Sequence, residues 1–186
     1  MQNKDNKKFI KNYLNDLYNL SLDLDVDTLI KISSCIIDCS NSKGTTYIVG
    51  NGESASIASH VAIDFLKALG IRAMTFNESS LITCYANDFG YANWVKEAIK
   101  IYSKKKDCVI FISSSGESSN ILNGARFALE NELNVITFSG FKKNNSLFSM
   151  GHFNIWVDSS NYNYVEILHN KFLLILVDLI KANLSK

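Results

Sequence analysis

Apolar residues recur along the chain at two different spacings, and the change between them separates helices from strands. Over residues 5–20 they follow the 3.6-residue period of an amphipathic helix. A second helix is expected over 27–39, with Asp25 or Asp27 as its N-cap. At 45–50 the pattern becomes a short apolar, β-branched run that ends in glycine. Such a run is typical of a buried strand.

Four further strand-like runs follow, each separated from the last by a helix-sized interval. Alternating strands and helices indicate a parallel sheet covered on both faces. The sequence therefore predicts one α/β domain over residues 1–186, with three layers, a five-stranded parallel sheet and extra N-terminal helices at about 5–40. The further strands are expected at 72–76, 108–113, 134–139 and 153–158, and the helices between and after them at 54–69, 94–103, 118–131 and 164–184.

Composition and charge exclude several classes of function. The 186 residues are 47% hydrophobic and carry a net charge of only +1, so the chain lacks the basic surface that nucleic-acid binding requires. No apolar stretch reaches the length of a membrane span, and the first eight residues are too polar to begin a secretory signal. A cytoplasmic protein without nucleic-acid or membrane partners is expected.

The four cysteines do not form a recognisable metal or disulfide motif. Cys35, Cys39, Cys84 and Cys108 include no CxxC pair and no histidine at zinc-finger spacing. Cys35 and Cys39 lie one helical turn apart, which would suit a metal clip. Their apolar neighbours favour reduced packing residues on a half-buried helix face instead.

Segment 108–121 runs from an apolar strand through a hydroxyl-rich turn into a helix. The turn has one glycine, which allows backbone amides at the helix N-terminus to point outward. Such a nest suits the phosphate group of a small molecule, and the alternative is an ordinary serine N-cap. The residues concerned are Ser113, Ser114, Ser115, Gly116 and Ser118.

A second ligand-binding loop, G-N-G-E-S at 50–54, follows the first strand. It lacks the third glycine of a dinucleotide-binding fingerprint and the lysine of a P-loop, so neither class of nucleotide site fits. Its glycines leave room for a ligand, and Ser54 is expected to cap the next helix. Both loops follow strands, and ligands of open α/β sheets bind at the carboxyl ends of strands.

The helix after this loop carries His60 and Asp64 among apolar residues on nearly every side, a composition that predicts burial. The two side chains are four residues apart and therefore share one helix face. They would bind one metal ion, act as an acid and a base, or form a structural hydrogen bond inside the core.

These motifs together, with N-D-F-G at 87–90, resemble the sugar isomerase (SIS) family and, within it, the phosphoheptose isomerases. The resemblance implies a flavodoxin-like strand order, a phosphosugar ligand and a homotetramer in which the N-terminal helices pack on neighbouring subunits. It also implies phosphate binding by Ser113, Ser114, Ser115 and Ser118, and sugar contacts from Asn51, Ser54 and Asp88.

Two departures from the family pattern concern the catalytic groups. The family has a glutamate where this chain has Asp64, and a glutamine and a histidine where it has Glu166 and Leu174. His169 lies three residues after Glu166, so it is a candidate replacement for the missing histidine, with a packing role as the alternative. The resemblance leaves zinc open as a cofactor, with His60, Asp64 and Glu166 as its ligands.

The resemblance implies an aldose–ketose isomerase that converts sedoheptulose 7-phosphate to glycero-manno-heptose 7-phosphate through an enediol, for lipopolysaccharide or capsule synthesis. Asp64 is the expected base and His169 the second proton carrier. The alternative is a non-catalytic phosphosugar-binding regulator or adaptor, which the leucine at 174 would fit.

Overall fold

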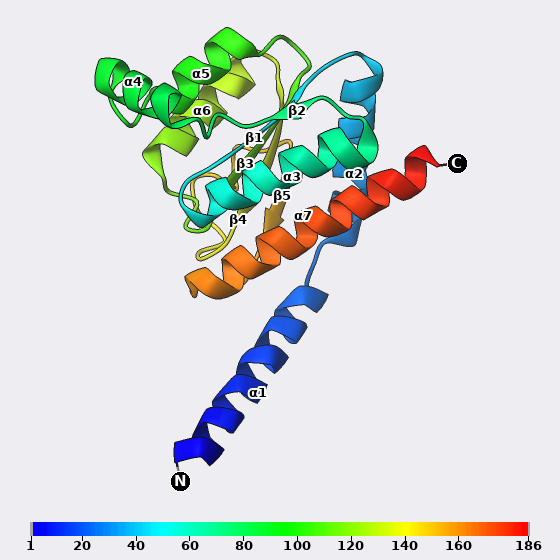
Figure 1. Cartoon of the computed structure of the whole chain (residues 1–186), viewed down its shortest axis with the longest axis vertical. Coiled ribbons are helices and arrows are strands. Elements are labelled where there is room, and N and C mark those ends of the chain that lie inside the picture. The colour runs from blue at the N-terminus through cyan, green and yellow to red at the C-terminus, as the bar shows by residue number, and fades with distance from the viewer. Residues whose placement is uncertain (1, 186) are drawn as a thin grey trace.

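A computed structural model gives the fold of residues 2–185 and confirms the expected α/β class. In chain order the elements are α1 (Gln2–Leu22), α2 (Val26–Asn41), β1 (Thr46–Gly50), α3 (Glu53–Leu69), β2 (Ala73–Met74), α4 (Ser79–Phe89), α5 (Trp94–Tyr102), β3 (Cys108–Ser113), α6 (Ser119–Glu130), β4 (Asn134–Ser139), β5 (Phe153–Trp156) and α7 (Tyr162–Leu184). Figure 1 shows their arrangement.

The five strands form one parallel sheet in the order β2-β1-β3-β4-β5, which is the predicted flavodoxin-like order. Gly50 at the end of β1 pairs with Ile112 near the end of β3. The two loops singled out in the sequence therefore leave the sheet side by side, at the edge where ligands of such sheets bind.

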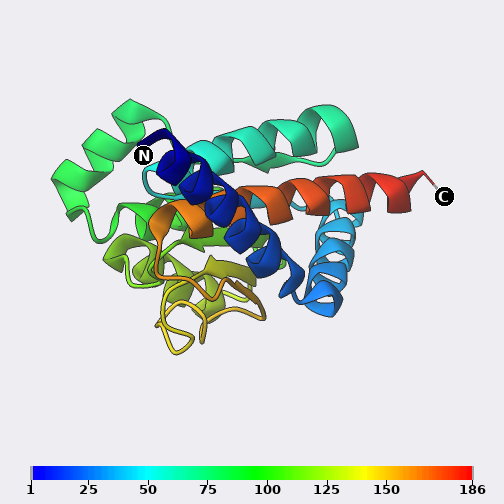
Figure 2. The same ribbon diagram turned by 90° about the horizontal axis from the view of Figure 1, so that it is seen from below.

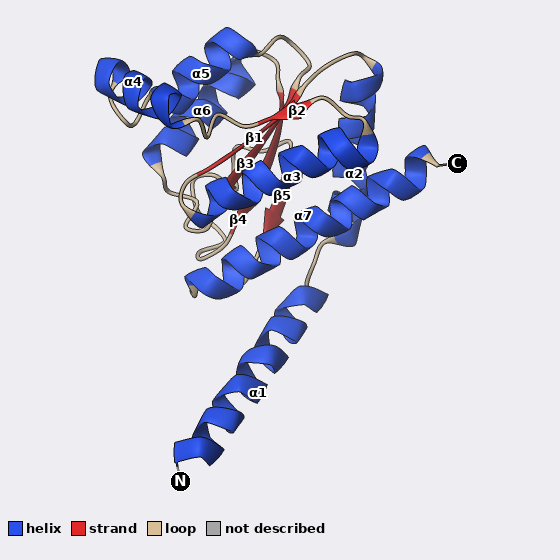
Figure 3. Cartoon of the chain, in the orientation of Figure 1, coloured by secondary structure: helices blue, strands red, loops and turns tan. Residues whose placement is uncertain are grey.

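Helices cover both faces of the sheet, as Figure 3 shows. Successive strand residues point to opposite faces, so Ile48 joins the core under α2, α3 and α7, and Val49 joins the core under α5 and α6. The strands are therefore apolar on both sides, which explains their continuous hydrophobic runs.

Helix starts depend on local capping, and one of the predicted caps is wrong. Asp25 does cap α2, because its Oδ1 accepts a hydrogen bond from the Thr28 amide at 2.9 Å. Ser54 does not cap α3; the N-cap is Gly52, and no side chain makes the capping bond. The helix begins at Glu53, so Ser54 already lies inside it, where its side chain is buried.

Two other elements differ from the prediction. The run at 72–76 gives only a two-residue strand, Ala73–Met74, at the edge of the sheet. Helix α4 was not predicted at all: none of its residues is buried, although Leu81, Ile82 and Tyr85 pack partly on the core.

Helix α1 extends from the body of the domain (Figure 1) and crosses the start of α7 (Figure 2). The Tyr13 and Tyr164 rings meet edge to face at 4.4 Å, and the Tyr164 hydroxyl donates to Asp16 Oδ2 at 3.2 Å. Helix α1 also exposes large apolar residues to solvent: Phe9, Ile10, Leu14, Tyr18 and Leu22. No helix within residues 2–185 combines the length and hydropathy that a membrane span needs.

The prediction that α3 is buried on every side is wrong for the single chain. One face packs on the sheet and α7, while Ile63 and Leu66 on the outer face are 57% and 48% exposed. The helix belongs to an outer layer, so the sheet covers only one of its sides. An exposed apolar face of this kind is typical of an interaction surface.

Candidate active site

The hydroxyl-rich turn follows β3 and ends at Ser118, the N-cap of α6. The Ser118 side chain makes no capping hydrogen bond; its Oγ instead accepts one from Ser113 Oγ at 3.3 Å. The capping alternative therefore does not use the serine hydroxyls. The Gly116 amide donates to the Ser113 carbonyl oxygen at 3.0 Å and the Glu117 amide donates to Ser115 Oγ at 3.3 Å, so the hydroxyls and the amides at the start of α6 are the groups suited to bind an anion.

Gly116 fixes the shape of this turn. Its φ of 69° lies in the left-handed region, and a Cβ added there would collide with the Asn145 side chain. The neighbouring Glu117 accepts hydrogen bonds from the amide and the hydroxyl of Ser146, both at 2.8 Å. The 141–150 loop therefore packs against the turn and stabilises its shape. The sequence did not reveal this contact.

Asn51 in the other loop is also held by specific partners. Its side-chain amide exchanges two hydrogen bonds of 2.9 Å with Asn120 on α6, and the Tyr91 hydroxyl donates to its Oδ1 at 3.2 Å. Asn120 is buried, so this pair ties the two ligand loops together. Sequence reasoning missed both Asn120 and Tyr91, because neither belongs to the loop motifs.

The two loops and the start of α7 enclose a cavity of about 130 Å³. It contains every predicted phosphate-binding serine, both predicted sugar contacts of the first loop, and Glu166 from the predicted metal set. Its lining is Asn51, Ser54, Ile112, Ser113, Ser114, Ser115, Ser118, Tyr162 and Glu166. Tyr162 is an addition that only the fold reveals.

Glu166 is the ionisable group of this cavity. The Ser114 hydroxyl donates to its Oε1 at 3.4 Å. Loss of water around the carboxyl raises the pKa of Glu166 above its usual range; the Ser114 bond lowers it, and the charge of Glu53 raises it again. Glu53 and Glu166 also share an adjoining hollow of about 360 Å³. A carboxyl whose pKa is raised is better suited to giving a proton as well as taking one.

His169 lies inside the core rather than in this cavity. Its Nε2 is 3.1 Å from the Ser139 carbonyl oxygen, and its Nδ1 has no partner among the described residues. Complete burial lowers the pKa of His169 to about 4, so the ring is neutral at pH 7. The structure does not bring this predicted proton carrier to the serine turn.

His60 and Asp64 form a pair elsewhere on the surface. His60 Nε2 is 3.3 Å from Asp64 Oδ2, and the side chains are 61% and 30% exposed. Asp64 lies ten residues after Ser54, or about 15 Å further along the helix axis. Within residues 2–185 no three His, Cys, Asp or Glu side chains are close enough to hold a metal ion. One chain alone therefore does not assemble the zinc site expected from His60, Asp64 and Glu166.

Asp88 also lies outside the cavity. It sits near the end of α4, where its carboxylate accepts hydrogen bonds from Asn87 Nδ2 at 2.9 Å and from Cys84 Sγ at 3.7 Å. Its side chain is exposed. The predicted sugar contact of Asp88 stays a prediction.

Residues 11–140 match the SIS domain family. The chain belongs to that family. A phosphoheptose isomerase of Thermodesulfovibrio yellowstonii is 30% identical over 161 residues, which cover 83% of this chain and 80% of the relative.

Solved structures agree on the fold of this SIS-domain protein. A phosphoheptose isomerase from Francisella tularensis superposes with a TM-score of 0.87 at 20% identity, covering 98% of this chain and 99% of that one. Another from Neisseria gonorrhoeae gives a TM-score of 0.88 at 18% identity, covering 95% and 98%. At such identities the likeness establishes the fold, and the site must support the function.

Proposed function

We propose that this chain is a phosphoheptose isomerase that interconverts sedoheptulose 7-phosphate and glycero-manno-heptose 7-phosphate. One observation carries the proposal: the serine turn, Asn51, Ser54 and the carboxyl of Glu166 line the same cavity. The name of the Thermodesulfovibrio relative supports it. A cytoplasmic location and a role in heptose biosynthesis are part of the same proposal.

The serine turn holds the phosphate end of the open-chain sugar. Hydroxyls and backbone amides at the start of α6 supply hydrogen-bond donors, and the helix dipole favours the negative charge there. Fixing the phosphate converts binding energy into orientation of the distant carbonyl carbon. Asn51, held by Asn120, then contacts the sugar chain.

Isomerisation moves one proton between C1 and C2 and another between their two oxygens. Asp64 remains the proposed base for the carbon-bound proton. We assign the proton exchange between the oxygens to Glu166, in place of His169, because Glu166 lines the cavity and its pKa is raised. His60, Asp64 and Glu166 are the residues that would hold zinc once subunits bring them together, and no step of this scheme is routed through the metal.

Asp64 requires a neighbouring subunit in this scheme. It lies about 15 Å along α3 from Ser54, which is too far to reach a substrate held in the same chain's cavity. Exposed apolar residues also lie on α3 and α7, namely Ile63, Leu66, Ile167 and Ile175. We therefore propose a homotetramer in which α3 of one subunit completes the cavity of another.

The decisive experiment supplies sedoheptulose 7-phosphate in deuterium oxide and follows the label into C2 by NMR. We expect exchange with the wild type, and with Glu166→Gln a kcat lower by roughly 10²–10⁴-fold at a nearly unchanged KM. The acid limb of the wild-type pH–rate profile should lie above the usual glutamate range, because the pKa of Glu166 is raised.

Glu130→Gln is the matched control, because Glu130 is an exposed glutamate on α6 that does not line the cavity. It should keep wild-type kinetics. If the protein binds a phosphosugar but no deuterium enters C2 with or without added metal, the isomerase proposal is wrong. The chain would then be a non-catalytic regulator or adaptor. Wild-type kcat in Glu166→Gln would overturn the role of Glu166 alone.

A further inference from the structure

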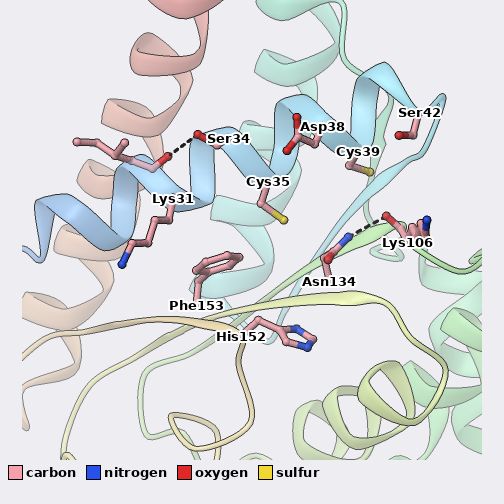
Figure 4. Close-up of a pocket in the computed structure, with 11 residues that line it drawn as sticks. Lys31, Ser34, Cys35, Asp38, Cys39, Ser42, Lys106, Asn134, His152 and Phe153 are labelled. Carbon is pink, nitrogen blue, oxygen red and sulfur yellow. Dashed lines mark hydrogen bonds between the residues drawn. The ribbon is translucent and has the colours of Figure 1, made fainter.

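A second cavity, of about 620 Å³, lies at the opposite end of the sheet from the serine turn. It opens between α2 and the beginnings of β4 and β5, as Figure 4 shows. The strand that links the two ends is β3, which starts at Cys108 and finishes at Ser113. Nothing in the proposed isomerase mechanism uses this cavity.

Three of the four cysteines gather at this cavity. Cys35 and Cys39 project from α2 into it (Figure 4), and Cys108 is fully buried behind them. The sulfur of Cys35 is 3.8 Å from that of Cys108. Cys39 Sγ instead donates to the Thr45 carbonyl oxygen at 3.7 Å. One thiol of the Cys35–Cys108 pair therefore faces the cavity, while the other is shielded.

The surroundings favour Cys35 as the reactive member. Of the three thiols gathered here, Cys35 is only partly buried and lines the cavity, whereas Cys39 and Cys108 are buried. A hydrogen bond from Cys108 lowers the pKa of Cys35, and the same contact raises the pKa of the Cys108 thiol. The partly buried Cys35 sulfur is thus the attacking thiol, and the fully buried Cys108 sulfur is the resolving one.

The three thiols fit a metal site less well than they fit a disulfide pair. The described residues contain no group of three His, Cys, Asp or Glu side chains with metal-binding geometry. A disulfide needs only two sulfurs, at about 2.05 Å. The two sulfur atoms, 3.8 Å apart, must approach by about 1.8 Å to form it.

We propose that Cys35 and Cys108 form a reversible, peroxide-sensitive disulfide pair. The Cys35 thiolate attacks one oxygen of hydrogen peroxide; the O–O bond breaks, sulfenic acid forms, and one water leaves after protonation. The Cys108 thiol then attacks the Cys35 sulfur, its proton goes to the departing hydroxide, and a second water leaves. Peroxide is reduced by two electrons and the two thiols are oxidised by two. An external thiol restores the pair.

The test is peptide mapping after treatment of the full-length protein with hydrogen peroxide and alkylation of the remaining thiols. Trypsin places Cys35 and Cys39 together in residues 32–43 and Cys108 in residues 107–126. We expect these two peptides joined, lighter by two hydrogens, and separated again by dithiothreitol. Fragmentation on either side of Asp38 assigns the link to Cys35 or to Cys39.

Cysteine variants identify which two thiols form the disulfide and which of them is oxidised first. Cys39→Ser is the matched control and should keep the link, whereas Cys35→Ser should lose it. In Cys108→Ser the Cys35 sulfenic acid should persist and react with dimedone. Because Cys108 is buried and its variant is at risk of misfolding, the wild-type link decides the matter by itself.

A link through Cys39, direct over-oxidation of Cys35 without a link, or dimedone labelling of Cys108 before Cys35 would each overturn the proposal. So would the absence of any link when the exposed Cys84 is fully oxidised. These outcomes are independent of isomerase activity, because the thiol pair and the serine turn lie at opposite ends of β3.

Discussion

At the scale of single residues, the phosphate site depends on backbone shape as much as on hydroxyls. Gly116 has a positive φ, and its missing side chain leaves the space that Asn145 occupies. Asn145 in turn donates to Ser139 Oγ at 3.1 Å and to the Lys142 carbonyl oxygen at 2.8 Å. The turn and the loop behind it are therefore one packed unit.

Gly116→Ala should lower the free energy of unfolding by about 2–6 kcal/mol, since backbone strain and overpacking each cost about 1–3 kcal/mol. The matched control is Gly52→Ala, which also has a positive φ, 55°, but meets nothing within 4 Å. It should cost only the backbone strain. Urea unfolding of both variants measures the difference, and equal losses would show that Asn145 does not constrain the turn.

His169 should make the fold sensitive to acid. Because the pKa falls to about 4 in the folded chain, the unfolded chain binds more protons as the pH drops below about 6.5. Stability is therefore full above pH 6.5 and declines toward pH 4, by roughly 3 kcal/mol in total.

Urea midpoints of the wild type between pH 7.5 and 4 should follow this decline. His169→Gln should have a flatter profile, because an amide does not titrate in this range. A variant profile as steep as that of the wild type would assign the acid sensitivity to other groups.

The sequence located the serines, Asn51 and Ser54, because turn and loop chemistry is local. It did not separate Glu166 from His169, although they are three residues apart on α7. One residue faces the serine turn and the other faces Phe138, and only the packing of α7 on the sheet decides which is which. The burial of His169 likewise depends on tertiary packing, which the sequence alone does not show.

At the scale of elements, sequence reasoning succeeded where the pattern was strong. β1, β3 and β4 are buried on both faces, and each strand ends at the residue predicted. β2 and α4 lie at the margins of the fold: β2 has only two residues, and no residue of α4 is buried. The elements that sequence patterns describe poorly are thus those with little tertiary packing.

Helix α4 should exchange its amide hydrogens at least roughly tenfold faster than α5 under native conditions, because few buried contacts oppose its local opening. Helix α5 is a suitable control, since it is adjacent and of similar length but buries Trp94, Val95, Ala98 and Ile99. Hydrogen–deuterium exchange with mass spectrometry resolves both segments. Equal protection would mean that another part of the assembly covers α4.

At the scale of the whole molecule, the single chain leaves two apolar surfaces in solvent. One is on α1, and the other is on α3 and α7, where α3 also carries His60 and Asp64. Patches of this kind mark protein interfaces. The proposed catalytic base would therefore lie in an interface, remote from its own chain's serine turn, and that arrangement makes catalysis a property of the assembly.

Complementation between inactive subunits tests this arrangement. Asp64→Asn removes the proposed base, and Ser114→Ala weakens phosphate binding; each homo-oligomer should lose most of its activity. If each site takes its serines from one subunit and its aspartate from another, random equal mixing restores about one quarter of the sites. Co-expression with two affinity tags isolates the mixed oligomers, and the deuterium-exchange assay measures them.

Mixed oligomers as inactive as their parents would place both residues in the same subunit's site, whereas wild-type activity of Asp64→Asn alone would place Asp64 outside the mechanism. Mixing Asp64→Asn with Glu166→Gln then distinguishes the two proton carriers. Because Glu166 lines the same cavity as the serines, this second pair should also recover about one quarter of the sites. Suppose that activity recovers when Asp64→Asn is mixed with Ser114→Ala but not when it is mixed with Glu166→Gln. Glu166 would then act in the same subunit's half of the site as Asp64, not in the half that carries the serines.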